Sequence, residues 1–186
     1  FSMAPGDTVK YAFAVAVGDD DADYYYQVWE AKKLFDALYN GPTAPPAPRL
    51  TAIPGDGRVT LYWDDTPETA IDPATGEADF EGYKIYRSED GGVTWGTKIT
   101  DAQGRTYGYV PIAQFDLDNN IKGADPKNSL AWLGTDSGLR HSWVDSSVTS
   151  GITYSYTVVS YDRGTPTLYS LESTRGDGPQ VSNFVT

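Results

Sequence analysis

The sequence predicts an all-β fold: a β-sandwich that carries a long inserted loop and follows an N-terminal strand and α-helix. The 186 residues are 39% apolar and 13% aromatic, which is typical of a folded protein. Beyond a Pro-rich run at residues 42–48, short segments of alternating apolar and polar residues are separated by turn clusters. This pattern is characteristic of sandwich domains.

The first 41 residues are expected to be a strand and a helix left from an upstream domain. Thr8–Val17 is rich in β-branched and aromatic residues, which predicts a strand. Its unpaired backbone would add to a sheet edge of this molecule or of a neighbour, giving strand-mediated self-association. Residues 24–41 predict an amphipathic helix, capped by Asp21 or Asp23, with an apolar stripe of Val28, Ala31, Phe35 and Leu38.

The segment at 42–48, PTAPPAP, is expected to be a stiff linker, because each proline ring restricts the backbone. Residues 49–186 then form the sandwich. Its strands are expected at residues 49–53, 58–63, 80–88, 141–145, 153–162 and 180–186.

The insertion at about 95–141 shows few regular period signals and is therefore predicted to be a long loop. We expect four large apolar side chains to hold it on the sandwich: Trp95, Phe115, Trp132 and Leu133.

The formal net charge of -12 would repel phosphate backbones and anionic lipids, so nucleic acid is not an expected partner. No apolar run approaches the roughly 18–20 residues that a membrane span needs, so none is expected. The chain has no Cys, which excludes disulfides and thiolate chemistry.

Three segments resemble fibronectin type III domains, which have an immunoglobulin-like β-sandwich. They are PAPRLTAIPGDGRVTLYW, which contains Trp63, GYKIYRSEDGG, and SGITYSYTVVSYD. In the last of these, Tyr154 follows Gly151 at the spacing of the tyrosine corner, whose hydroxyl bonds to the backbone upstream. The resemblance covers Pro42 to Thr186.

Nearly the whole chain is also similar to modules of very large secreted or surface proteins of bacteria. Segments similar to YVPIAQFDLDNNIKG and DSGLRHSWVDSSVTSGITYSYTVVSYDRG recur there in the same order. This resemblance implies an extracellular or cell-surface location, with neighbouring domains of the same polypeptide as partners. It implies a non-catalytic structural, spacer or interaction module. The alternative is a carbohydrate-binding or adhesive domain that contacts a surface glycan or protein, accessory to a secreted glycosidase or other hydrolase.

FDLDNNIKGADP is the candidate calcium site, and no other cofactor is expected. Asp116, Asp118 and Asn120 are spaced by two, so their oxygens can converge on one cation, with Asp125 completing the set. The segment departs from an EF-hand loop because Ile121 stands where Gly is required. The alternative is a turn in which these side chains bond their own backbone.

Catalysis is not expected, because the residues that would carry it are few or poorly spaced. His141 is the only histidine available to a Ser-His-Asp arrangement. Glycosidases hold two carboxyl groups on separate rigid elements. The carboxylates here come from one loop: Asp64, Asp65, Glu68, Asp79 and Glu81.

Two further features have both a functional and a structural interpretation. Arg175-Gly176-Asp177 matches the integrin-binding tripeptide, although a chance match is common in a Gly- and Asp-rich chain. Tyr24, Tyr25, Tyr26 and Trp29 could stack on sugar rings, or could simply cover apolar surface.

Overall fold

The computed structural model describes residues 13–36, apart from the side chain of Lys33, and residues 41–164, 168–176 and 182–186. Contacts divide the chain into two units. The first comprises Phe1–Thr43 with Pro73–Thr75, and the second comprises Ala44–Asp72 with Gly76–Thr186.

The first unit contains helix α1, Asp21–Asp36, which confirms the predicted helix over its described residues. The carboxylate of Asp20 accepts the backbone N–H of Asp23 at 2.8 Å, and the Asp23 carboxylate accepts that of Asp19 at 3.0 Å. Asp20 is therefore the N-cap, one residue before the first predicted candidate, because its carboxylate reaches the free N–H three residues on.

The strand predicted at Thr8–Val17 is wrong over its described part, residues 13–17, which have no regular secondary structure. Phe13, Val15 and Val17 are 94%, 85% and 79% exposed. A strand forms only where a second backbone pairs with it, and no described strand pairs with these residues. Residues 8–12 lie outside the described part, and self-association through this segment stays a prediction.

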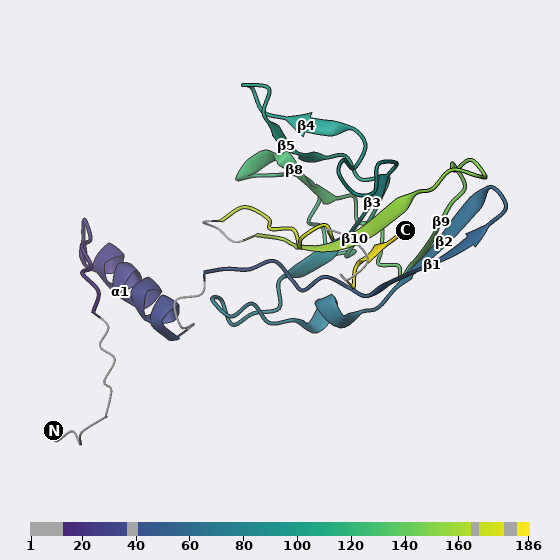
Figure 1. Ribbon diagram of the computed structural model, residues 1–186. Coiled ribbons are helices and arrows are strands. Elements are labelled where there is room, and N and C mark those ends of the chain that lie inside the picture. The colour runs from purple at the N-terminus through teal and green to yellow at the C-terminus, as the bar shows by residue number, and fades with distance from the viewer. Residues whose placement is uncertain (1–12, 37–40, 165–167, 177–181) are drawn as a thin grey trace, which may run out of the picture. The chain divides into compact units, whose positions relative to one another are not determined.

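The second unit is built from antiparallel strands in two main sheets (Figure 1). The first sheet has the order β1-β2-β9, with β1 at Leu50–Gly55, β2 at Arg58–Trp63 and β9 at Ser142–Asp145. The second has the order β11-β10-β3-β6, with β11 at Phe184–Val185, β10 at Ser155–Asp162, β3 at Phe80–Ser88 and β6 at Ala113–Asp116.

One hydrophobic core joins the two sheets, as a β-sandwich requires. Leu50, Leu61 and Trp63 come from the first sheet. The strands β3, β6 and β10 of the second sheet contribute Phe80, Tyr83, Ile85, Phe115, Tyr156 and Val158. The all-β prediction is confirmed, and β2 and β3 have the predicted bounds because their apolar side chains alternate into this core.

The prediction that residues 95–141 form a loop is wrong, because this insertion folds into short strands. In addition to β6 it contains β4 at Lys98–Thr100, β5 at Thr106–Tyr109, β7 at Gly123–Asp125 and β8 at Asn128–Gly134. The strands β4 to β7 have three or four residues, too few to give a readable period, and the seven-residue β8 does not alternate regularly. Of the four expected anchors, Trp95, Phe115 and Leu133 are buried, whereas Trp132 is 50% exposed.

The insertion lies on the outer face of the four-stranded sheet. Figure 1 shows β4, β5 and β8 on the side of β3 and β10 that is away from β1, β2 and β9. A second apolar cluster fills this face and consists of Tyr86, Trp95, Val159 and Phe184. As a result both faces of β3 and β10 are covered, and even Lys84 is only 7% exposed.

The end of the Pro-rich segment packs on the second unit. Pro45 and Pro48 are buried, and the Ser160 hydroxyl lies 2.9 Å from the carbonyl oxygen of Pro45 and 2.8 Å from that of Pro46. Within the described residues, no helix is both long and apolar enough to cross a membrane.

Candidate functional site

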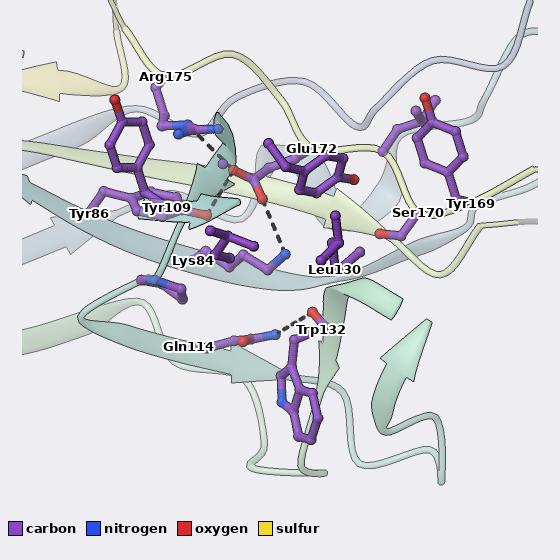
Figure 2. Close-up of a pocket in the computed structure, with 16 residues that line it drawn as sticks. Lys84, Tyr86, Tyr109, Gln114, Leu130, Trp132, Tyr169, Ser170, Glu172 and Arg175 are labelled. Carbon is purple, nitrogen blue, oxygen red and sulfur yellow. Dashed lines mark hydrogen bonds and ion pairs between the residues drawn. The ribbon is translucent and has the colours of Figure 1, made fainter. Parts of the chain in front are cut away.

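A pocket of about 160 Å³ lies between the outer face of the four-stranded sheet and the insertion (Figure 2). Lys84 and Tyr86 point into it from β3, because they alternate with the core residues Tyr83 and Ile85. The remaining wall comes from β4, β5, β6, β8, from Pro111 between β5 and β6, and from the segment at 169–175. The pocket therefore exists only because the insertion folds back over the sheet.

Glu172 is the charged centre of this pocket. Its carboxylate lies 3.1 Å from the ammonium of Lys84 and 3.6 Å from Nε of Arg175. The Tyr86 hydroxyl donates to the same carboxylate at 2.9 Å. Figure 2 shows Lys84 and Arg175 reaching Glu172 from two different sides. Both cations are therefore paired with this one carboxylate, which leaves one net positive charge in the group, and the carboxylate is held in one orientation.

The two cations also lie over aromatic rings. The Lys84 ammonium is 4.4 Å from the centre of the Tyr161 ring, and the Arg175 guanidinium is 4.9 Å from that of Tyr86 and 5.2 Å from that of Tyr109. Such contacts stabilise a partly desolvated cation. Burial, reinforced by the charge of Glu172, raises the pKa of Tyr86, so its hydroxyl stays a hydrogen-bond donor.

Aromatic side chains and an amide complete the pocket wall. Tyr107, Trp132 and Tyr169 are 44%, 50% and 43% exposed. The Gln114 amide donates to the Tyr161 hydroxyl at 2.7 Å and to the carbonyl of Trp132 at 3.3 Å, which fixes its orientation. The wall thus combines flat apolar surface with oriented polar groups, which is the usual composition of a ligand site.

The sequence did not reveal this pocket. Its residues lie on five strands and two connecting segments, so no local motif contains them. In the sequence, Arg175 belongs to a recognisable motif only through the Arg175-Gly176-Asp177 tripeptide. The structure packs Arg175 against Tyr86 and Glu172, and Asp177 lies outside the described residues.

The predicted calcium ligands Asp116 and Asp125 are buried and bonded to backbone donors. Asp116 accepts the backbone N–H groups of Thr135 at 2.9 Å, Asp136 at 2.6 Å and Ser137 at 3.0 Å. These bonds hold the chain after β8 against β6. Asp125 accepts N–H groups of Lys127 at 2.7 Å and Ser170 at 2.6 Å.

The other two predicted ligands are on the surface. Asp118 is exposed, and Asn120 is exposed with a backbone φ of 66°. Among the described residues, no three His, Asp or Glu side chains are grouped so that they could hold a metal ion. Calcium binding by these four residues stays a prediction.

His141 pairs with Glu68, a residue of the short 3-10 helix η1, Thr66–Thr69. Its Nε2 lies 2.6 Å from the Glu68 carboxylate, which also accepts the Tyr83 hydroxyl at 2.9 Å. The His141 side chain is 46% exposed and is not part of the pocket wall. These contacts hold η1, in the segment between β2 and β3, against the sandwich.

The remaining carboxylates that were weighed for sugar hydrolysis are dispersed. Asp64 accepts the backbone N–H of Arg49 at 3.1 Å, and Asp65 is exposed. Asp79 is buried, and its burial and the nearby charge of Asp72 raise its pKa.

Glu81 is fully buried in β3, where burial raises its pKa to about 7. Asn119 donates to one of its oxygens at 3.0 Å. The other oxygen has no hydrogen-bond partner among the described residues. The Glu81 carboxyl group is therefore buried inside the protein and is not part of the pocket wall.

The aromatic side chains of α1 are exposed, with Tyr24 at 45%, Tyr25 at 69%, Tyr26 at 44% and Trp29 at 54%. Tyr24 and Tyr25 contact each other edge to face, and so do not offer one flat surface. The pocket in the second unit is accordingly the better defined candidate.

No protein-family model matches this chain, and comparisons with curated proteins and with solved structures found no match either. The function proposed for the chain therefore depends on its own residues and geometry.

Proposed function

We propose that this chain is a non-catalytic interaction module of the fibronectin type III kind, from a large extracellular protein of a bacterium. In this proposal residues 1–41 belong to an upstream domain, 42–48 connect it, and 49–186 form the sandwich. The order of the strands supports the fold in this proposal, and the similarity of segments such as YVPIAQFDLDNNIKG to bacterial surface modules supports the location.

The strand order supports an immunoglobulin-like topology. In that topology the first, second and fifth strands share one sheet, and the third, sixth and seventh share the other. Here β1, β2 and β9 form one sheet, and β3, β10 and β11 lie in the other with β6 added beside β3. The insertion supplies β6 and the other short strands.

A bond at the start of β10 also supports this family. The Tyr154 hydroxyl accepts the backbone N–H of Thr149 at 3.1 Å. A tyrosine near the start of the sixth strand that bonds the backbone a few residues upstream is the tyrosine corner of such sandwiches. Tyr154 also packs at the edge of the core.

The chemistry of the ionisable groups favours binding over turnover. In the pocket, Glu172 is held by Lys84 and Arg175, and outside it His141 is paired with Glu68 at the surface. Acid catalysis of glycoside cleavage needs two carboxyl groups that face each other across the substrate. Glu172 is the only carboxylate in the described wall of the pocket.

The pocket favours an interaction role over spacing alone. A spacer domain needs a stable core and defined ends, and a plain sandwich has both without the short strands β4, β5, β7 and β8 of the insertion. Here the insertion builds a concave wall with half-exposed aromatic rings. This observation supports the carbohydrate-binding alternative within the same extracellular role.

Protease treatment of intact cells that make the parent polypeptide tests the extracellular location. Peptides from residues 49–186 should be released before a cytoplasmic marker protein is degraded. Their release only after lysis would contradict the proposal. A panel of chromogenic glycosides and peptides tests the non-catalytic role: turnover that disappears in the Glu68→Gln or Glu172→Gln variant would overturn it.

A further inference from the structure

The aromatic rim of the pocket is the first observation that indicates a ligand class. Tyr107, Trp132 and Tyr169 come from β5, β8 and the segment after β10, and each is about half exposed. Single exposed aromatic residues are ordinary on protein surfaces, but three around one concavity are not. Flat rings with polar ends suit a ligand that has both an apolar face and hydroxyl groups.

The polar groups of the pocket supply both hydrogen-bond acceptors and donors. The Glu172 carboxylate and the carbonyl oxygen of the Gln114 amide are acceptors, because both hydrogens of the Gln114 amide nitrogen are already donated to Tyr161 and Trp132. The Arg175 guanidinium is a donor. All three are oriented by partners inside the protein. Neighbouring hydroxyls of a sugar ring both donate and accept, so they match such a set, and pre-oriented groups lose little entropy on binding.

The charged groups of the pocket carry one net positive charge, but their pairing with one another favours a neutral ligand. Glu172 already neutralises Lys84 and lies beside Arg175, whose guanidinium is packed against the Tyr86 and Tyr109 rings. A carboxylate or sulfate on the ligand would have to compete with Glu172 for these cations. The net charge of -12 would also repel an anionic ligand as it approached.

The size of the pocket favours a single ring. Sites for drug-sized ligands usually enclose roughly 300–1,000 Å³, whereas this pocket has about 160 Å³. A polyproline peptide also binds aromatic grooves, but it rises about 3.1 Å per residue and needs an elongated surface for successive contacts. One ring at the end of a longer chain fits the smaller space.

We propose that the pocket formed by Trp132, Tyr107, Tyr169 and the Glu172 centre binds the terminal neutral hexopyranose of a glycan. The apolar face of the sugar stacks on the aromatic rim, and its hydroxyls bond to Glu172, Gln114 and Arg175. This inference rests on the interaction role proposed above and specifies its ligand.

The test uses the full 186-residue chain. It is first screened on an array of neutral oligosaccharides ending in glucose, galactose, mannose or N-acetylglucosamine, with uronate- and sialate-terminated glycans alongside. The methyl glycoside of the best terminal sugar is then titrated by calorimetry and by tryptophan fluorescence. We expect binding of at least one neutral terminus and a fluorescence change that the Trp132→Phe variant lacks.

Two alanine variants distinguish binding in the pocket from non-specific binding to other exposed aromatic side chains. Trp132→Ala should weaken binding of the methyl glycoside at least tenfold, and its half-exposed position means that the fold should survive, as circular dichroism can verify. Trp29→Ala is the matched control, since this side chain is 54% exposed on α1 and lies outside the pocket. It should bind as the unmodified chain does.

A variant of Glu172 tests the charge argument. Glu172→Gln leaves Lys84 and Arg175 without their carboxylate, so affinity should move away from neutral glycans and toward uronate-terminated ones.

Three results would overturn the proposal: no binding of any neutral glycan, binding only of acidic glycans or of a proline-rich peptide, or unchanged affinity in Trp132→Ala. If protease releases peptides of this chain from intact cells but no glycan binds to it, the proposed ligand is wrong. The proposed extracellular location is then still supported.

Discussion

The indole of Trp63 in β2 stacks on the ring of Phe115 in β6, with centroids 6.2 Å apart and planes inclined by 21°. The two residues come from opposite sheets, and both rings are buried. Phe115 belongs to the insertion, so the insertion contributes to the main core. It is therefore a structural part of the sandwich as well as the wall of the pocket.

Phe115→Ala should lower the free energy of unfolding by about 3–5 kcal/mol, because it removes a large ring from a packed core and leaves a cavity. Urea unfolding followed by fluorescence measures this loss. Val110→Ala, in the same insertion but 47% exposed, is the control and should change stability far less. A loss in Phe115→Ala no larger than in the control would mean that the insertion is not part of the core.

Gly82→Ala should also destabilise the protein, because β3 and β6 approach each other too closely at this position. A methyl group on Gly82 would lie 2.4 Å from the carbonyl oxygen of Phe115 and 2.9 Å from Cα of Asp116. Backbone atoms cannot move aside without disturbing the sheet, so a loss of about 3 kcal/mol is expected.

Gly108→Ala is the matched control for this substitution. Gly108 also lies in a strand, and a methyl group there would meet no atom within 4 Å. Its effect should stay within roughly 0.5 kcal/mol. Equal melting temperatures of the two variants would contradict the close approach of β3 and β6.

Asp145→Asn should break a buried polar cluster between the two sheets. Asp145 accepts from Arg87 at 2.8 Å, from the Tyr156 hydroxyl at 3.0 Å and from the Ser147 hydroxyl at 2.6 Å. Burial opposes ionisation of Asp145, but the bonds from Ser147, Arg87 and Tyr156 outweigh it and lower the pKa of this carboxyl.

Removing the charge of Asp145 should reduce stability by about 3 kcal/mol, because Arg87 keeps a partly buried charge without a partner. The double variant with Arg87→Met should lose less than the sum of the two single variants. Arg105→Met provides the comparison, since that side chain is 78% exposed and its ion pair with Asp101 lies at the surface. Additive losses would mean that Asp145 and Arg87 act independently.

The sequence predicted every strand of the two main sheets except β6, and most clearly those whose apolar side chains alternate. Val59, Leu61 and Trp63 identified β2, and Tyr83 with Ile85 identified β3. The same pattern could not show that Lys84 and Tyr86, on the other face of β3, are covered. Whether that face meets solvent depends on the insertion, whose strands have three or four residues or, in the seven-residue β8, no regular alternation.

The pocket was harder to predict because its charged centre joins residues 88 positions apart, Lys84 and Glu172. Composition and short motifs carry no information about such a pair. The aspartates in FDLDNNIKGADP illustrate a related difficulty. Their spacing suits a cation, yet Asp116 and Asp125 hold backbone N–H groups, and the same spacing serves both arrangements.

The buried carboxyl of Glu81 makes stability depend on pH near neutrality. Burial, assisted by the charge of Asp116, raises its pKa from 4.5 to about 7, although Asn119 and Arg163 act in the opposite direction. The folded protein therefore binds a proton more tightly than the unfolded chain does. This stabilisation is complete below about pH 4.5 and is lost as the pH rises through 7.

Asp162 contributes in the same direction, because burial raises its pKa to about 6. The folded chain should accordingly become less stable between about pH 5 and pH 8, and urea unfolding at a series of pH values measures the slope. Glu89→Gln, which removes an exposed carboxyl, is the matched control for the charge change.

Glu81→Gln should match the unmodified chain near pH 5 and exceed its stability at pH 8 by on the order of 2–3 kcal/mol. The amide cannot ionise, and its carbonyl can still accept the bond from Asn119. A residual slope from Asp162 should remain and should become smaller when Asp162→Asn is added, while Asp79, whose pKa is raised by burial, still contributes. A variant that is less stable than the unmodified chain at pH 8 would show that Glu81 is ionised and stabilising in the folded protein, contrary to its burial without a partner for one oxygen among the described residues.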